Sequence, residues 1–305
     1  MISRCDKQRQ LKRPSSSRQG FVLVMVLILL TVAAISLSGL ARRSLQLAAD
    51  AADAQADFER RWQTSTLQQA LLANVESLLA NQPQHVPEDV QTWPLPSFVE
   101  GRIMAGEYQY HFLLADEDAK VNVNQILRQK PDAWMPVVMT LSQSANAGGL
   151  LPAVSPVSSR QGQNRATLQS WGQVFQSKQQ DSSEASGPQI RDATRQLTCW
   201  GSGRLNVKRA SDEAISALCN LVLSDRVVGQ LIQERSTGDL TGIDDLISRL
   251  ELKAEERFAF QRLLTDRSNC FTLWLNVSNG QREWTRLVVS QSSRGSADNL
   301  LSFTW

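Results

Sequence analysis

Residues 15–43 read SSSRQGFVLVMVLILLTVAAISLSGLARR, and this stretch decides the architecture of the N-terminal part of the chain. A basic segment ends at Gly20, and an uncharged run then extends from Phe21 to Ala41. As a helix with a rise of ~1.5 Å per residue, this run is about 31 Å long, close to the thickness of a bilayer's hydrocarbon core. The run therefore predicts a transmembrane helix.

Charge is unevenly distributed around this run. Residues 1–20 hold six basic residues and one acidic residue, so they carry +5, and the formal net charge of +2 leaves −3 for residues 21–305. Because basic residues flanking a membrane segment stay in the cytoplasm, residues 1–20 are expected there and the body across the membrane. A slightly acidic body argues against nucleic-acid binding.

A secretory signal peptide is the alternative for the same stretch. The small residues Ser36, Ser38, Gly39 and Ala41 imitate a signal-peptidase site, so cleavage near Ala41 stays open. The apolar core is longer than that of a signal peptide, and Arg42 follows it directly, which favours a retained anchor.

Helical and strand periodicities follow the uncharged run. No Pro or Gly interrupts residues 41–80, where apolar residues recur at helical spacing, so one helix is expected over Phe21–Leu79. Asn279-Gly280 is a strong hairpin signal between two alternating runs. Strands are expected in four places: residues 102–114, 271–277, 283–290 and 300–305.

Between the first two of these strands the pattern is mainly helical. Asn124 is placed to cap a short helix, and Ser211 is placed to cap another whose apolar stripe includes Ile215. Thr241 with Asp244 has the spacing of a capping box before a third helix.

The boundary RQG|F at residues 18–21 resembles the N terminus of type IV pilins and type II secretion pseudopilins. In that family a short basic leader ends in Gly, the mature chain begins with Phe or Met, and an apolar helix follows. The resemblance implies cleavage by a prepilin peptidase between Gly20 and Phe21, with N-methylation of Phe21. The retained helix can then exchange lipid for neighbouring helices at little hydrophobic cost.

The fifth residue after this boundary distinguishes subunits of the family. Most members carry Glu there, which pairs with the N-terminal amine of an adjacent subunit, whereas this chain has Met25. An intramembrane carboxylate costs about 2.5–3.5 kcal/mol, so it is kept only for a purpose. The chain resembles minor pseudopilin K of type II secretion systems in three features. These are the missing carboxylate, the acidic stretch at residues 116–124 and the later stretch at residues 199–207. Within these stretches Lys120-Val121-Asn122-Val123 is echoed by Arg204-Leu205-Asn206-Val207.

The resemblance implies an α+β fold. A long N-terminal transmembrane helix continues into a pilin-like α/β domain with an antiparallel sheet, and this domain carries a large inserted helical domain. The expected parts are a cleaved basic leader (1–20), the transmembrane (21–41) and periplasmic (42–80) parts of the helix, a pilin-like domain in two pieces (81–127 and 266–305) and the inserted domain (128–265).

The resemblance also implies a function in protein secretion. The chain is expected to be a tip subunit that initiates and caps the periplasmic pseudopilus, which pushes folded proteins through the outer membrane. Expected partners are other minor pseudopilins, the prepilin peptidase and the inner-membrane assembly platform. The expected location is the bacterial inner membrane, with the N terminus cytoplasmic and the C-terminal domain periplasmic. A minor pilin of a type IV pilus and a signal-anchored periplasmic enzyme stay open as alternatives.

No catalytic motif stands out. His85 and His111 lie in no zinc-binding pattern, and the chain has neither a nucleophile elbow nor a Walker A loop, so we expect no enzyme and no required cofactor. Calcium is the ion that the resemblance suggests, and Asp239, Asp244 and Asp245 are candidate ligands because calcium prefers oxygen.

Three of the four cysteines follow the transmembrane run. Cys219 lies on the apolar side of an expected helix and is expected to be buried as a small hydrophobic residue. Cys199 and Cys270 each begin a strand-like run, so they are the expected pair if an oxidising compartment favours one disulfide.

Overall fold

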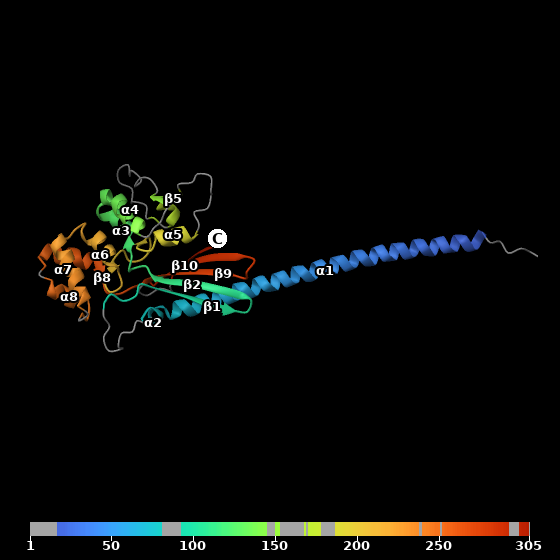
Figure 1. Cartoon of the computed structure of the whole chain (residues 1–305), viewed down its shortest axis with the longest axis horizontal. Coiled ribbons are helices and arrows are strands. Elements are labelled where there is room, and N and C mark those ends of the chain that lie inside the picture. Colours follow the sequence, from blue (N-terminus) through green and yellow to red (C-terminus); the bar gives the residue numbers. More distant parts are fainter. Residues whose placement is uncertain are drawn as a thin grey trace, which may run out of the picture. The chain divides into compact units, whose positions relative to one another are not determined.

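The structure is a computed structural model that describes residues 17–80, 93–144, 150–152, 168, 170–177, 187–237, 240–250, 252–292 and 299–304 (Figure 1). Contacts between residues divide the chain into two units, Met1–Trp62 and Gln63–Trp305.

Helix α1 (Ser17–Ala73) begins inside the basic leader and continues through the whole uncharged run. It holds the only described segment that is long and apolar enough to cross a membrane, with a mean hydropathy of 2.8 in its most apolar window. By length and composition this agrees with the predicted anchor. The single helix predicted over Phe21–Leu79 is nevertheless wrong at its end, because the helix breaks at Asn74 and a short α2 (Val75–Ala80) follows.

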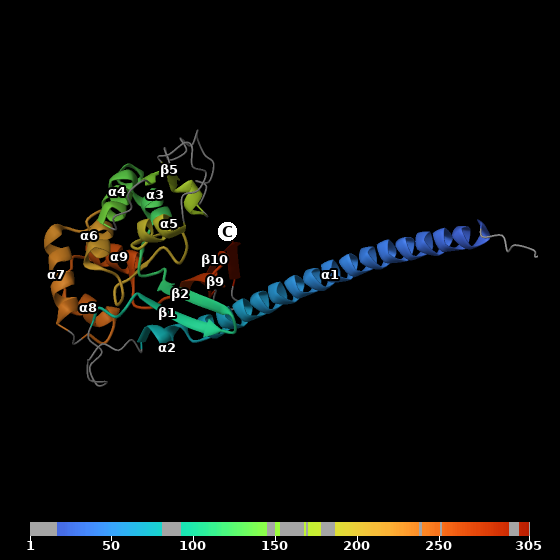
Figure 2. The ribbon, with the colours of Figure 1, turned by 45° about the vertical axis from the view of Figure 1, so that its right-hand side comes forward.

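The second unit is built on a five-stranded antiparallel sheet in the order β1-β2-β9-β10-β11 (Figure 2). Its strands are β1 (Phe98–Ala105), β2 (Tyr108–Asp116), β9 (Cys270–Ser278), β10 (Glu283–Gln291) and β11 (Asn299–Thr304). Strands β2 and β9 are neighbours with Asp116 opposite Phe271, although residues 117–269 lie between them in the chain. The strands predicted after residue 270 are confirmed, and so is the turn at Asn279-Gly280.

The single strand predicted at residues 102–114 is wrong. The chain turns at Gly106, and β1 and β2 form a hairpin on either side of it. The φ of Gly106 is +59°, in the left-handed region that glycine adopts without a side-chain clash. Within β2 the side chains alternate, and Tyr110 and Leu114 lie on the buried side.

The sheet is covered on both faces. On one face Leu71, Val75 and Leu79 pack with Phe112, Leu114 and Leu273 in one apolar cluster. On the other face Trp274, Leu287 and Val289 belong to a larger cluster formed with the helices between β2 and β9. The fold class is therefore α+β, with an apolar N-terminal helix, an antiparallel sheet and further helices.

The described residues between β2 and β9 form a body of short helices, many of which lie at one end of the sheet in Figure 1. The helices are α3 (Val123–Gln129), α4 (Trp134–Ser144), α5 (Gly187–Ala193), α6 (Asp212–Cys219), α7 (Asp225–Ser236), α8 (Ile243–Arg249) and α9 (Ala254–Leu263), with 3-10 turns at Pro131–Ala133 and Trp171–Gln173. Short strands pair as β3 (Val121–Asn122) with β6 (Leu197–Thr198), β4 (Leu150–Pro152) with β5 (Phe175–Ser177), and β7 (Leu205–Asn206) with β8 (Leu264–Thr265).

The predicted helix starts have mixed outcomes. Ser211 caps α6 by accepting a hydrogen bond from the Ala214 amide, as predicted. The prediction for Asn124 is wrong, because Asn122 caps α3. The prediction for Thr241 with Asp244 is also wrong by one residue, since the Asp245 carboxylate accepts the hydrogen bond of the Thr241 amide, at 3.2 Å. The predicted domain limits within residues 81–305 stay predictions, because the contacts divide the chain only after Trp62.

Candidate functional sites on the helix and at the polar junction

The predicted processing site lies in the first turns of α1. Gly20 and Phe21 are both helical, and the Phe21 side chain is exposed. Every side chain from Phe21 to Ala56 is exposed. Cleavage between Gly20 and Phe21, and N-methylation of Phe21, stay predictions.

Large apolar side chains also remain exposed beyond the uncharged run. Leu45 is 71% exposed, Phe58 is 68% exposed and Trp62 is 62% exposed. Phe58 and Trp62 are four residues apart, so they lie on the same side of the helix. Exposed apolar residues on one helical face are typical of a surface that packs against another helix. We call Phe58 and Trp62 the exposed helix face.

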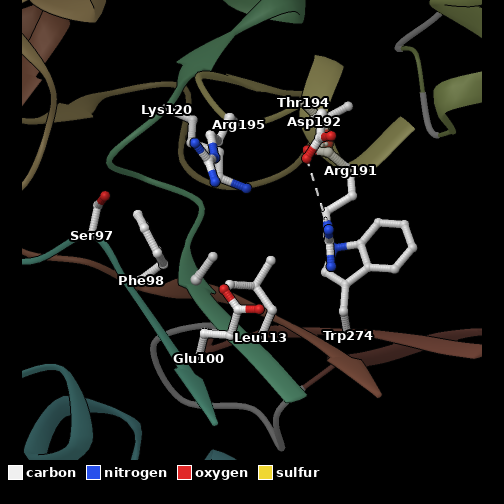
Figure 3. A pocket seen from close by; sticks show the side chains of 11 residues that line it. Ser97, Phe98, Glu100, Leu113, Lys120, Arg191, Asp192, Thr194, Arg195 and Trp274 are labelled. Atoms are coloured by element: carbon white, nitrogen blue, oxygen red, sulfur yellow. Dashed lines mark hydrogen bonds and ion pairs between the residues drawn. The ribbon is translucent and has the colours of Figure 1, made fainter. Parts of the chain in front are cut away.

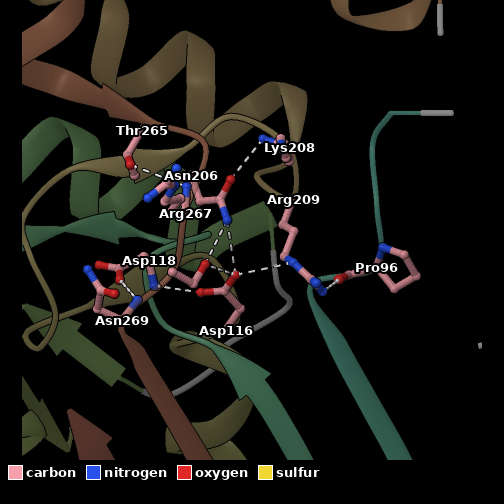
Figure 4. Close-up of polar contacts among 10 residues, drawn as sticks. Pro96, Asp116, Asp118, Asn206, Lys208, Arg209, Thr265, Arg267 and Asn269 are labelled. Atoms are coloured by element: carbon pink, nitrogen blue, oxygen red, sulfur yellow. Dashed lines mark hydrogen bonds and ion pairs between the residues drawn. The ribbon is translucent and has the colours of Figure 1, made fainter. Parts of the chain in front are cut away.

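In the second unit, the acidic stretch Asp116-Glu117-Asp118 is fully buried at the end of β2. Asp118 joins two distant loops, and Figure 4 shows its contact with Asn269. Its Oδ1 accepts hydrogen bonds from the amide and the hydroxyl of Ser202, both at 2.9 Å, and its Oδ2 accepts one from the Asn269 amide at 2.8 Å. Burial raises the pKa of Asp118, and these hydrogen bonds to the ionised form oppose that rise.

Gly201 explains why the loop can approach this carboxylate so closely. Its φ is +87°, and a Cβ atom placed there would be 2.6 Å from Oδ1 of Asp118. Only glycine avoids both the backbone strain and the clash. The Gly-Ser-Gly run at residues 201–203 was the sequence signal for this tight turn, and the sequence interpretation did not use it.

Asp116 is bound by side chains from two later parts of the chain, near residues 206–209 and at Ser268. It accepts hydrogen bonds from the Ser268 hydroxyl and from Nδ2 of Asn206, the latter at 3.4 Å, and Nε of Arg209 lies 3.6 Å from its Oδ2. Burial is the main cause that raises the pKa of Asp116 to about 7, and the nearby Asp118 adds to the rise. The hydroxyl of Ser268 and the charge of Arg209 oppose it.

Glu117 is held between the sheet and the start of the body. Its Oε1 accepts hydrogen bonds from the Lys120 ammonium and, at 2.6 Å, from the Thr272 hydroxyl of β9. An ion pair buried in this way leaves a bare charge if one partner is removed. The hydrogen bond from Thr272 joins Glu117 to β9.

The acidic stretch at residues 116–124 and the stretch at residues 199–207 meet here. Nδ2 of Asn122 donates to the carbonyl of Trp200 at 2.6 Å, and Nδ2 of Asn124 donates to the carbonyl of Cys199 at 2.8 Å. The amide of Asn206 donates to the carbonyl of Asp118 at 2.5 Å. The polar junction fixes the start of the helical body to the end of the sheet. We use this name for the buried side chains of Asp116, Glu117, Asp118, Asn122, Asn124 and Asn206.

A buried arginine, which sequence reasoning missed, extends this network. Arg235 on α7 is 2% exposed, and its guanidinium donates to the carbonyls of Val207 and Ala210 and to the Asp212 carboxylate. Burial lowers the pKa of Arg235, and Asp212 opposes this shift. The guanidinium thus holds α7 against the loop that precedes α6.

Cys199, Cys219 and Cys270 are free and buried in the structure. Burial raises the pKa of all three thiols, to about 12 for Cys219, and the carboxylate of Glu117 adds to the rise for Cys199 and Cys270. The burial predicted for Cys219 is confirmed. A disulfide between Cys199 and Cys270 stays a prediction.

The candidate calcium ligands are not brought together by described contacts. Asp239 lies outside the described residues, and Asp244 is in the first turn of α8. Asp245 forms an ion pair with Arg249 at 3.1 Å, and this hydrogen-bonded partner lowers the pKa of Asp245. Among the described residues no group of three or more His, Cys, Asp or Glu is arranged to hold a metal ion. Calcium binding stays a prediction.

The histidines give no catalytic arrangement within the described chain. His85 lies outside the described residues, and Nε2 of His111 is 2.7 Å from the Glu100 carboxylate. The buried carboxylates of the polar junction bind main-chain amides, hydroxyls and basic side chains, an arrangement that favours a structural role.

Comparison with known proteins shows a structural likeness but no match in sequence. No protein-family profile matches the chain, and no curated protein sequence matches it. A chain in the crystal structure of the GspK-GspI-GspJ complex from the enterotoxigenic Escherichia coli type 2 secretion system is similar to it, with a TM-score of 0.49 and 13% sequence identity. The likeness covers 83% of this chain and 98% of that chain.

Proposed function

We propose that this protein is a minor pseudopilin of a type II secretion system. In this role it is a tip subunit that initiates and caps the periplasmic pseudopilus. The observation that carries the proposal is α1: one continuous helix includes the end of a basic leader, an uncharged run of membrane-spanning length, and a face that stays exposed as far as Trp62. Such a helix suits a subunit that leaves the lipid bilayer and packs against the N-terminal helices of other subunits.

The chemistry of the uncharged run supports a position at the end of the filament. Phe21–Ala41 contains no carboxylate, and Met25 stands where a stacking subunit of this family carries Glu. Without that carboxylate the chain has no intramembrane partner for the amine of a neighbour. Assembly then depends on apolar packing along α1, to which the exposed helix face contributes.

The partners in this proposal are other minor pseudopilins, the prepilin peptidase and the inner-membrane assembly platform. The peptidase cuts on the cytoplasmic side after Gly20, and the mature chain stays in the inner membrane with its second unit in the periplasm. Catalysis has no part in this function, because the work is mechanical: helix–helix packing replaces helix–lipid packing as subunits leave the bilayer.

Mass spectrometry of the N terminus of the protein purified from membranes tests the proposal. We expect an N-methylated Phe21 at the terminus and loss of processing in a Gly20→Val variant. A Gly39→Ala variant, whose added Cβ meets nothing within 4 Å, is the matched control and should be processed normally. An intact Met1, or a terminus near residue 42, contradicts the proposal and favours a simple anchor or a secretory signal peptide.

Co-purification separates the two filament systems. A photo-crosslinking residue in place of Trp62 is expected to capture the N-terminal helix of a second pseudopilin encoded beside a secretion ATPase and secretin. Capture of type IV pilus subunits instead favours the minor-pilin alternative. A monomer that joins no filament complex favours a signal-anchored enzyme.

A further inference from the structure

A small basic pocket lies on the face of the sheet that the helical body covers, beside strand β1 (Figure 3). Its volume is about 40 Å³, which is room for roughly three water molecules at 10–15 Å³ each. A carboxylate group, with three heavy atoms, is of this size. Phe98, Leu113 and Trp274 of the sheet contribute to the lining on one side.

Three cationic side chains contribute to the other side of the pocket: Lys120, Arg191 and Arg195. Lys120 already pairs with Glu117. Nε of Arg191 is 3.7 Å from the Asp192 carboxylate, which is too long for a hydrogen bond. The guanidinium of Arg195 lies 5.7 Å from the centre of the Phe98 ring, and no carboxylate of the described residues is within ion-pair distance of it.

The acidic residues of the lining, Glu100 and Asp192, do not neutralise the charge of Arg195. Glu100 points toward the same space, but its carboxylate is 2.7 Å from Nε2 of His111. Asp192 is the near neighbour of Arg191. A carboxylate that enters the pocket therefore meets the charge of Arg195 beside an aromatic ring, and a hydrogen bond between charged groups is stronger than one between neutral groups.

Strand β1 forms an edge of the sheet directly beside the pocket. It pairs with β2 along its whole length, Phe98–Ala105, and no described strand pairs with its other side. The strand contains no Pro, and its side chains alternate between the two faces of the sheet. A peptide that extends the sheet at such an edge places every second side chain on the face that carries Phe98 and Glu100.

We propose that the β1 edge and the basic pocket bind an extended, acidic segment of a partner protein. The segment adds a strand next to β1, and one of its Asp or Glu side chains places its carboxylate against Arg195 and Arg191. Main-chain hydrogen bonds supply affinity, and the pocket supplies the preference for an acid. All the residues involved belong to the second unit, so the inference does not depend on the proposed secretion function.

Fluorescence anisotropy with the full chain in detergent tests this. The probe is a labelled seven-residue peptide that alternates glutamate with valine or threonine, and its control carries glutamine in place of glutamate. We expect the glutamate peptide to bind at least about tenfold more tightly, because one charge-assisted hydrogen bond contributes that much. The Arg195→Gln variant should lose this preference. An Arg282→Gln variant, altered at an exposed turn away from the pocket, should keep it.

Two further measurements distinguish a peptide carboxylate bound by strand addition from a free carboxylate. Glutarate, a free dicarboxylate, should not displace the peptide at equal concentration, and a peptide N-methylated at alternate residues should bind far more weakly because it cannot pair with β1. The proposal is overturned by equal binding of the glutamate and glutamine peptides, by an unchanged preference in the Arg195→Gln variant, or by absence of binding. Effective competition by glutarate, or full binding of the N-methylated peptide, overturns the strand-addition step.

Discussion

Asp116 is expected to make the stability of the second unit depend on pH in a direction opposite to that of most carboxylates. Its pKa rises from 3.8 to about 7 in the folded state, chiefly because of burial. Between these two values the folded chain holds a proton that the unfolded chain has released. The contribution of Asp116 to the free energy of unfolding is therefore greatest at low pH, and it decreases until pH passes about 7.

The size of the effect follows from the shift. A change of roughly 3 pKa units at ~1.36 kcal/mol per unit corresponds to about 4 kcal/mol in total. About 3 kcal/mol of this should be lost between about pH 5 and about pH 8. The groups that face Asp116 are Arg209, Ser268, Asn206 and Asp118, and the charge of Arg209 moderates the loss.

Urea unfolding of the full chain in detergent, followed by tryptophan fluorescence, measures this. The Asp116→Asn variant is the reference, because its side chain does not titrate while all other groups still do. From about pH 5 to about pH 8 the unfolding midpoint of the wild type should fall relative to the variant by about 1 M urea. Parallel pH profiles for the two proteins would refute the assignment of a raised pKa to Asp116.

Two further substitutions test the packing. Gly201→Ala should lower the free energy of unfolding by more than about 2 kcal/mol, because its Cβ would lie 2.6 Å from Oδ1 of Asp118 at a φ of +87°. The control Gly229→Ala, in open space on α7, should be neutral or stabilise by up to about 1 kcal/mol; equal effects in urea unfolding would contradict the close contact. Leu114→Ala should destabilise by about 2–5 kcal/mol because Leu114 is 0% exposed. Leu45→Ala, at a site 71% exposed, should change the free energy of unfolding by less than about 0.5 kcal/mol. A similar loss at both sites would show that the cluster beside the sheet is not a tight core.

The polar junction explains why local motifs predicted the parts of this fold better than their assembly. Asn122 and Asn124 have the same intrinsic preference for a helix cap, and their neighbours in sequence do not distinguish them. The structure assigns the cap to Asn122 and turns the side chain of Asn124 toward the carbonyl of Cys199. A carbonyl from residue 199 is decisive here, and nothing in residues 120–126 indicates it.

The sequence by itself determined the features that depend on neighbouring residues. The helix through Phe21–Ala41 was predictable because an uncharged apolar run of this length is typical of one. The cap at Ser211 was predictable because its partner is three residues away. The alternation at residues 108–114 predicted a strand, since a period of two is a property of the strand's backbone.

Only the tertiary structure decided the features that join remote segments. It divided residues 98–116 into a hairpin at Gly106, and it paired β2 with β9 across the helical body. It also placed Asp118 between Ser202 and Asn269. The physical reason is that a buried carboxylate or strand edge must find hydrogen-bond partners when water is removed, and those partners are supplied by chain segments that no local pattern connects.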